Sequence, residues 1–389
     1  MSLFKKVVLF IHRWLGLLSG LVVFIVSISG CVYSFQDQIQ DALFSYRKVN
    51  RGSGDMLLPS RLITIAKERY PGGKVSLVNY YTPDRTAQVR IDTGKVQHSL
   101  FIDPYTGRLI HDDPDFKHNF FNTVKSIHFY CFFPPAIGKT VVGSSTIIFM
   151  VIMITGLVLW WPLRKFDRKR SLTIKWKTRW RRVNYDLHSV IGFYVFSISF
   201  LLAFSGLSMS YDWLSKSIYW TANGGKEYKK ELKKYTSDTT TKVQNIAVIK
   251  IIDAGFLYAR KRSPKTEMML ISPGALPKSP ISYTCYPRVF HFSYSDTYSI
   301  DQYTGKVLKE LPNTRKSTGL VLLGMNYDIH VGQIAGLSGQ IIMFLAGLIS
   351  ASLPVTGLFI YLGKKKSILL RKGRGAHSVR QRRLDKSLN

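Results

Sequence analysis

The sequence predicts a membrane protein with a bundle of four transmembrane helices, built from two parallel repeats that each carry an α+β domain outside the membrane. Three observations support this prediction: four long apolar stretches, basic clusters beside them, and an internal duplication of the 389-residue chain. Each stretch holds the roughly 20 residues needed to cross a bilayer core, and none contains Lys, Arg, Asp or Glu. The stretches cover residues 15–35, 140–161, 191–210 and 334–362.

The net charge of +32 is concentrated beside these stretches. Residues 164–182 contain ten Lys or Arg, and residues 364–389 contain another ten. Lys5, Lys6 and Arg13 add a third basic cluster at the N-terminus. Basic segments next to transmembrane helices face the cytoplasm and bind anionic lipid. The charge therefore predicts contact with a membrane surface rather than with nucleic acid, and it places both termini in the cytoplasm.

Orientation and span positions together divide the chain into alternating membrane and aqueous segments. The predicted transmembrane helices, with the short N-terminal segment included in the first, are 1–36, 139–162, 188–210 and 334–362. Two α+β domains, 37–138 and 211–333, lie outside. A basic loop, 163–187, and a basic tail, 363–389, lie in the cytoplasm.

The duplication is clearest at the start of the first and third stretches. His12 and His188 are 176 residues apart, and each is followed four residues later by a glycine, Gly16 or Gly192. Both stretches contain Ser-Gly, and its glycine lies 18 residues after the histidine. Repeats in the same orientation are related by an axis along the membrane normal. The four predicted helices should therefore surround such an axis.

The outer segments repeat as well. "IDPYTGRLI" (102–110) matches "IDQYTGKVL" (300–308), and each is followed by a histidine, His128 or His330, and then by a span that contains Thr-Gly-Leu. In the first segment, residues 60–72 predict an amphipathic helix capped by Ser60, followed by alternating strands and a hairpin closed by a glycine turn. The second segment repeats this pattern around residues 247–259.

Four histidines stand at two levels of the predicted bundle. His12 and His188 open spans at the cytoplasmic edge, whereas His128 and His330 precede spans at the outer edge. Repeat symmetry lets each pair meet near the axis, and 18 helical residues, about 27 Å, separate the levels. Two stacked two-histidine sites are what a pair of b-type haems requires. The other histidines, His98, His111, His291 and His377, are expected at the surface.

Further residues are candidates around these sites. Gly16 and Gly192 lie on the histidine side of their helices and leave room for a flat macrocycle. Arg13 is a candidate partner for haem propionates, although it also suits a lipid anchor. His118 is the alternative ligand to His128.

Other kinds of site fit the sequence less well. Zinc would need a third and a fourth ligand at each level, and a proton relay would need acidic residues within the spans. No C-x-x-C-H motif for covalent haem occurs. Whether Cys131 and Cys285 form a disulfide stays open.

These motifs, together with "HRWLGLLSGL", "LVLWWP", "NYDLHSVIGF" and "YDIHVGQIAG", resemble the PepSY-associated transmembrane proteins, which include FoxB-like reductases of the bacterial inner membrane. The resemblance implies a dihaem cytochrome with two haem b groups that carries electrons outward to a periplasmic ferric siderophore. It assigns haem ligation to His12, His128, His188 and His330.

The expected activity is therefore haem-dependent ferric reduction. Its partners are a ferric siderophore or other ferric chelate outside, and a cytoplasmic or quinol electron donor, because no nicotinamide or flavin fingerprint is present. Two alternatives remain. The outer domains would bind peptides or regulate a protease without enzymatic activity, or the chain would be a siderophore permease, although four uncharged spans make a poor aqueous path.

Overall fold

The computed structural model describes residues 2–94, 96–114, 118–162, 169, 171–240, 245–274 and 276–385. The chain divides into two compact units. The first, here called the helical unit, comprises Met1–Val32, Ser126–Ser210 and Ile341–Asn389. The second, the sheet unit, comprises Tyr33–Lys125 and Tyr211–Gln340. Part of the predicted basic loop 163–187, namely residues 163–168 and 170, lies outside the described residues.

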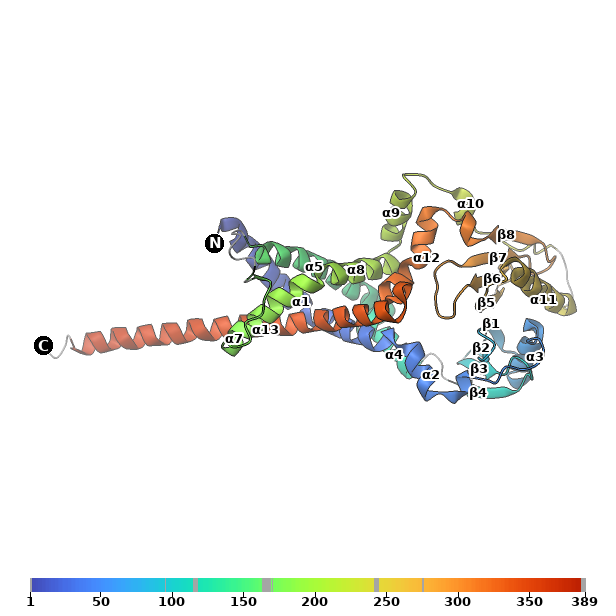
Figure 1. Cartoon of the computed structure of the whole chain (residues 1–389), viewed down its shortest axis with the longest axis horizontal. Coiled ribbons are helices and arrows are strands. Elements are labelled where there is room, and N and C mark those ends of the chain that lie inside the picture. The colour runs from blue at the N-terminus through green and yellow to red at the C-terminus, as the bar shows by residue number, and fades with distance from the viewer. Residues whose placement is uncertain are drawn as a thin grey trace. The chain divides into compact units, whose positions relative to one another are not determined.

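Long apolar helices form the helical unit (Figure 1). They are α1 (Leu3–Ser34), α5 (Pro135–Trp160), α8 (Gly192–Ser210) and α13 (Gly336–Asp385). A short helix, α7 (Trp180–Asp186), and a π-helical turn, η3 (Leu187–Ile191), run directly into α8. Four helical stretches of the described residues are long and apolar enough to cross a membrane: Leu3–Ser34, Pro135–Trp160, Trp180–Ser210 and Gln333–Lys364. The four predicted spans are thus confirmed as candidate membrane helices.

Small and aromatic side chains bring these helices together. Small residues allow backbones to approach closely, which is the usual basis of helix packing in a membrane. Helix α1 meets α13 at Gly20, where a Cβ would lie only 3.2 Å from Pro354. Helix α5 meets α8 through the Trp160 and Phe193 rings, which stack at 3.6 Å. Helix α8 meets α13 through the Ser199 and Ser350 hydroxyls, which are 2.8 Å apart.

The sheet unit contains an eight-stranded antiparallel sheet with the order β4-β3-β2-β1-β5-β6-β7-β8. The strands of the first segment are β1 (Lys74–Tyr80), β2 (Ala87–Asp92), β3 (Gln97–Ile102) and β4 (Leu109–Asp113). Those of the second are β5 (Met268–Pro273), β6 (Ile281–Tyr286), β7 (Asp296–Ile300) and β8 (Val307–Leu311).

Strands β1 and β5 join the two outer segments into one sheet. Their antiparallel register pairs Val78 with Ile271 and Tyr80 with Met269. An unpaired edge strand presents open N–H and C=O groups to other chains. The pairing of β1 with β5 covers one such edge of each four-stranded half.

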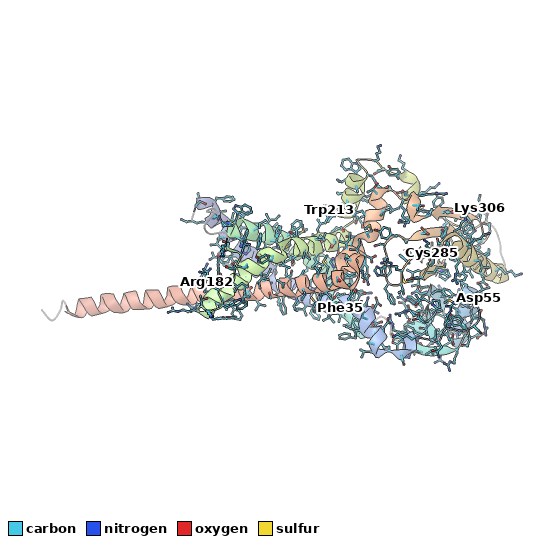
Figure 2. All side chains as sticks on the ribbon, in the orientation of Figure 1. Phe35, Asp55, Arg182, Trp213, Cys285 and Lys306 are labelled. Carbon is cyan, nitrogen blue, oxygen red and sulfur yellow. The ribbon has the colours of Figure 1, made fainter. Side chains whose placement is uncertain are left out.

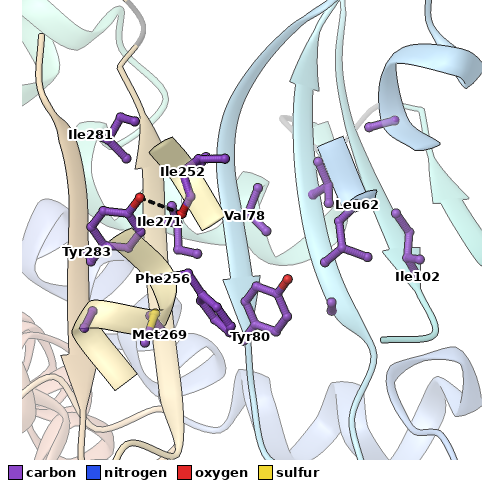
Figure 3. Packing of buried hydrophobic residues seen from close by; sticks show 14 of the residues in the cluster. Leu62, Val78, Tyr80, Ile102, Ile252, Phe256, Met269, Ile271, Ile281 and Tyr283 are labelled. Atoms are coloured by element: carbon purple, nitrogen blue, oxygen red, sulfur yellow. Dashed lines mark hydrogen bonds between the residues drawn. The ribbon is translucent and has the colours of Figure 1, made fainter. Parts of the chain in front are cut away.

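Two helices, α3 (Pro59–Arg69) and α11 (Asn245–Arg262), cover one face of this sheet. Leu62 of α3 and Phe256 of α11 are buried against strand residues such as Val78 (Figure 3). The Tyr283 hydroxyl donates a 2.9 Å hydrogen bond to the Ile252 carbonyl, which fixes α11 to β6. The core of the sheet unit is thus shared by both outer segments.

Glycine turns close the outer hairpins of both halves, as predicted. Asp103 accepts hydrogen bonds from the backbone N–H groups of Tyr105 and Thr106, and Asp301 makes the equivalent bonds in the second half. Gly107 and Gly305 follow with φ of +75° and +72°, a region that side chains rarely adopt. Burial raises the pKa of Asp103, but these hydrogen bonds outweigh that effect, and the pKa lies below its usual value.

Several shorter helices complete the sheet unit. The first segment adds α2 (Gln36–Leu43), the 3₁₀ turn η1 (Ser45–Arg47) and the start of α4 (Phe120–Tyr130). The second adds α9 (Asp212–Ala222), α10 (Lys229–Leu232), the 3₁₀ turns η4 (Asn313–Arg315) and η5 (Gln333–Ala335), and α12 (Thr318–Val331). Most of these lie in stretches for which the sequence predicted no helix.

Two local predictions were wrong. Ser60 does not cap α3, because Leu58 is the N-cap and Ser60 instead donates through its backbone N–H and its hydroxyl to Asp253 of α11. His98 is not at the surface, because strand pairing places it beside Asp112, with the His98 Nδ1 3.4 Å from a carboxylate oxygen. It is only 9% exposed.

The other histidines expected at the surface vary. His111 and His291 are half-buried, and the His111 ring stacks on Tyr46. The side chain of His377 lies outside the described part of the structure.

Candidate metal centre

His12 of α1 and His188 of η3 face each other within the helical unit. Their ring centroids are 6.2 Å apart, and the ring planes are nearly perpendicular, at 87°. The structure thus brings together the two histidines that the sequence placed at one level of the bundle. Each ring is also held by one further helix.

Helix α5 holds His12. The Nδ1 atom lies 3.1 Å from the Ile152 carbonyl oxygen and 3.0 Å from the Thr155 hydroxyl. A carbonyl can only accept, and the Thr155 hydroxyl donates its own proton to Ile152. Nδ1 therefore carries the proton of the neutral ring, and the lone pair lies on Nε2.

Helix α13 holds His188 in the same manner. Its Nδ1 lies 2.9 Å from the Thr356 hydroxyl, and its ring also hydrogen-bonds the Leu353 backbone. The Thr356 hydroxyl donates to the carbonyls of Ser352 and Leu353, so it accepts from the ring. Among the described residues, neither His12 nor His188 has a hydrogen-bond partner at Nε2. Both rings therefore present a nitrogen lone pair suited to a metal.

A glycine makes room for each ring. Gly156 follows Ile152 by four residues, and a Cβ there would lie 3.2 Å from Cε1 of His12. Gly357 follows Leu353 by four residues, and a Cβ there would lie 3.3 Å from Cε1 of His188. The Thr-Gly pair of each span thus supplies a hydroxyl acceptor and the space beside it.

The π-helical turn η3 places His188 at the junction of α7 and α8. Such single turns are rare and occur frequently at functional sites. The turn begins directly after Asp186, which is 1% exposed and accepts from Arg182 and from the Lys175 backbone N–H (Arg182 is labelled in Figure 2). The buried carboxylate therefore anchors the residues that precede the turn.

His128, in the part of α4 that belongs to the helical unit, follows the same rule. Its Nδ1 lies 2.8 Å from the Val26 carbonyl oxygen of α1, and Gly30 follows Val26 by four residues. A Cβ on Gly30 would lie 2.9 Å from Cε1 of His128. Nδ1 must donate to the carbonyl, so in this ring too the lone pair lies on Nε2.

His330 and His118 lie in the sheet unit. His330 is the penultimate residue of α12, and the pairing of His330 with His128 stays a prediction. His118 is exposed just before α4, and its carbonyl accepts from the Thr123 hydroxyl. Its role as an alternative to His128 likewise stays a prediction.

The remaining candidate residues, Gly16, Gly192 and Arg13, differ in how much space surrounds them. A Cβ on Gly16 would meet no atom within 4 Å, so the space that the sequence suggested is present on that helix. A Cβ on Gly192 would make ordinary contact with Leu353, at 3.6 Å. Arg13 is exposed, with its guanidinium carbon 5.8 Å from the centroid of the Trp14 ring.

Sequence reasoning missed two buried aspartates that stand two residues before a candidate ligand. Asp186 precedes His188, and Asp328, which is 0% exposed, precedes His330. The carboxylate of Asp328 accepts from the backbone N–H groups of Phe292 and Ser293. The shared pattern "NYDLH" (184–188) and "NYDIH" (326–330) was the available signal.

Other metal sites are not evident. Among the described residues, no group of three or more His, Cys, Asp or Glu side chains is placed to hold a metal ion. Cys31, Cys131 and Cys285 are buried, and no disulfide joins any two of them. A tetrahedral zinc site needs four ligands, which is more than the two histidines that meet here.

Comparison with known families decides the classification. A family model described as the PepSY-associated TM region matches residues 9–364. The chain belongs to this PepSY-associated transmembrane family. The match covers the four candidate ligands, His12, His128, His188 and His330, and parts of both units of this PepSY-associated protein. A comparison with curated proteins finds no match.

Proposed function

We propose that this protein is a dihaem b-type cytochrome of the bacterial inner membrane, with both termini in the cytoplasm. His12 and His188 would hold an inner haem, and His128 and His330 would hold an outer haem. The protein is a ferric reductase for iron acquisition. It takes electrons from a cytoplasmic protein or a quinol and gives them to an extracytoplasmic ferric chelate, such as a ferric siderophore.

The spacing of His12 and His188 is the observation that carries the proposal. Two imidazoles that hold one metal ion, each with a metal–nitrogen bond of about 2.0–2.1 Å, would have ring centroids that lie close together. The observed separation is 6.2 Å. Edge-to-face packing of rings also covers about 4.5–7 Å, so the distance needs a second argument.

The hydrogen bonds at Nδ1 supply that argument. Simple packing of two rings does not require that Nδ1 of each ring form a hydrogen bond to a different helix. An Nδ1–H bonded to a carbonyl or hydroxyl fixes the tautomer and raises the basicity of Nε2, as is usual for metal-bound histidine. His12, His128 and His188 all have this arrangement.

The position of the histidines along α1 supports two separate sites. Val26, which contacts His128, follows His12 by 14 residues, or about 21 Å of helix. When bound, two haems at these levels supply one-electron carriers within the uncharged spans. One electron converts one Fe(III) to Fe(II), which oxygen-donor chelates bind less tightly, and the donor is oxidised by one electron for each iron released.

The proposal is tested on the purified full-length protein by a pyridine haemochrome assay. We expect two haem b per chain and anaerobic reduction of a ferric chelate by the dithionite-reduced protein. His128→Ala should remove one haem, whereas His118→Ala should leave both. A colourless protein, or unchanged haem content in His128→Ala, would contradict the assignment.

A further inference from the structure

The sheet unit contains a cavity of about 670 Å³ that the haem proposal does not use. Its volume falls within the range of about 300–1,000 Å³ that is usual for small-molecule sites. The cavity lies between α2 and η1, the ends of β2, β3 and β4, and the loop after β6. The side chains that the argument uses are Tyr46, Arg47, Arg85, His111, Phe121 and Phe290.

Aromatic rings form one wall. Tyr46 stacks on His111 with centroids 4.0 Å apart and planes 16° apart, and it stacks on Phe44 at 5.3 Å and 20°. Phe101 packs against Tyr46 at 4.7 Å. Parallel rings of this kind offer flat faces to which another planar ring can stack.

Two arginines, Arg47 and Arg85, give the cavity a polar, positively charged part of its lining. Arg85 bonds both carboxylate oxygens of Asp41, and Arg47 bonds Asp41 and Asp37. Asp37 and Asp41 do not line the cavity, whereas both arginines and one other carboxylate, that of Asp113, do. Among the described residues, Nε of Arg85 and the hydroxyl of Tyr46 have no hydrogen-bond partner, so each has a donor to offer a ligand oxygen.

Phe290, in the loop after β6, lies beside these two arginines and also lines the cavity. The guanidinium carbons of Arg85 and Arg47 lie 4.8 and 5.6 Å from the centroid of its ring. Phe290 has φ of +59°, a conformation that a bulky residue rarely adopts without support. The support is Asp328, which binds the backbone of the same loop at Phe292 and Ser293.

We propose that this cavity binds a planar aromatic ring that carries negatively charged or hydrogen-bonding oxygens, namely the aryl group of a catecholate-type ferric chelate. The ring packs against the stacked cluster of Phe44, Tyr46 and His111, and its oxygens face Arg85. An aliphatic hydroxamate offers no aromatic face, so the lining favours the aryl class. The inference rests on the proposed ferric reductase function and names the substrate class.

The cavity is also suitably placed along the chain. Phe121 lines it and precedes His128 by seven residues in the sequence of α4. A chelate held at Phe121 would therefore bind close in sequence to a proposed outer haem ligand.

The test is calorimetric titration of the full-length protein with the gallium(III) complex of 2,3-dihydroxybenzoate. Gallium(III) replaces Fe(III) in this complex and is not reduced. Gallium acetohydroxamate is the non-aromatic comparison, and a benzoquinone headgroup tests for a quinone site. We expect the dihydroxybenzoate complex to bind at least tenfold more tightly than the hydroxamate complex. Equal binding of both gallium complexes, or binding of the quinone alone, would overturn the proposal.

Variants locate the binding. Tyr46→Leu should weaken binding of the aryl complex about tenfold, and Tyr303→Leu, which alters a half-buried tyrosine outside the cavity, should not. Phe290→Gly introduces a residue that readily adopts the positive φ and should also weaken binding. This variant keeps the proposal testable if Tyr46→Leu fails to fold. Unchanged binding in Phe290→Gly would overturn the proposal.

Because gallium is redox-inactive, this titration does not depend on electron transfer. Aryl binding by a protein without haem would contradict the proposed function and leave the cavity assignment standing. Two haems without selective aryl binding would do the reverse.

Discussion

The imidazole rings of His12 and His188 lie 6.2 Å apart although the two residues are separated by 176 positions in the sequence. Each is oriented through Nδ1 by a different helix, α5 for His12 and α13 for His188. Helices α1, α5 and α13, and the turn η3 that runs into α8, therefore contribute to one pair of side chains. The predictions below follow from this arrangement and from the anchors found in the sheet unit.

Thr356→Val should weaken the inner haem site while keeping its ligands. Valine fills the same volume but cannot accept the Nδ1–H of His188, so the ring becomes a poorer donor. Loss of such a bond typically costs 10–100-fold in metal affinity. We expect haem loss at lower denaturant and a higher midpoint potential, measured by redox titration. Thr140→Val, at an exposed position of α5, is the control, and equal behaviour of the two variants would argue against the role of Thr356.

Gly30→Ala should affect the outer site alone. The added Cβ would lie 2.9 Å from Cε1 and 3.1 Å from Nδ1 of His128, so the ring must move away from the Val26 carbonyl. Overpacking of this kind costs about 1–3 kcal/mol. We expect loss of one of two haems in the reduced spectrum. Gly54→Ala, where a Cβ meets no atom within 4 Å, should keep both.

Acid should destabilise the sheet unit through Asp41. Burial raises the pKa of this carboxyl, but the hydrogen bonds and charges of Arg85 and Arg47 outweigh burial and hold the pKa below its usual value. This stabilisation is fully present above the unfolded pKa of about 3.9 and is lost as the pH falls through the lower folded value. The contribution of Asp41 to the free energy of unfolding should therefore stay constant between pH 7 and 5 and be lost below about pH 4.

Asp41→Asn provides the comparison. It should reduce stability at pH 7 by about 3 kcal/mol, because it leaves two largely buried arginines without a full partner, and should flatten the acid dependence below pH 4. Asp55→Asn, at an exposed aspartate, should leave both unchanged. A wild-type slope below pH 4 in Asp41→Asn would show that other carboxyls cause the acid loss.

Asp328→Ala should loosen the loop that carries Phe290. The substitution leaves the backbone N–H groups of Phe292 and Ser293 without their buried acceptor, at a cost of about 3 kcal/mol. We expect faster amide exchange in residues 287–295 and weaker aryl binding. Glu227→Ala removes an exposed carboxylate and serves as the control. Native exchange protection of the loop in Asp328→Ala would contradict its anchoring role.

Periodicity and spacing were sufficient to predict the transmembrane helices and the helix at residues 60–72, which is α3. These depend on local composition, and the Asp-x-Tyr-Thr-Gly turns likewise depend on a glycine at one position. Helix α1 nevertheless begins at Leu3, before the apolar stretch, because backbone hydrogen bonds continue a helix beyond its apolar residues. The meeting of His12 with His188 followed from equivalent positions in the sequence.

Contacts between distant segments were not predictable in the same way. The pairing of β1 with β5 joins strands about 190 residues apart, and no local pattern specifies which edges meet. His98 was misassigned because its burial depends on Asp112 in the neighbouring strand. The fit of His128 against Gly30 depends on a missing Cβ, which the sequence marks only as part of a Ser-Gly pair.

The haem content of three variants tests the central claim most directly. If His12 and His188 ligate one iron, His12→Ala, His188→Ala and the double variant should each lose the same single haem, measured as half of the wild-type pyridine haemochrome absorbance per chain. The second replacement should cost nothing further, because the site is already lost. A double variant that loses twice as much as either single variant, or full haem content in all three, would contradict the account.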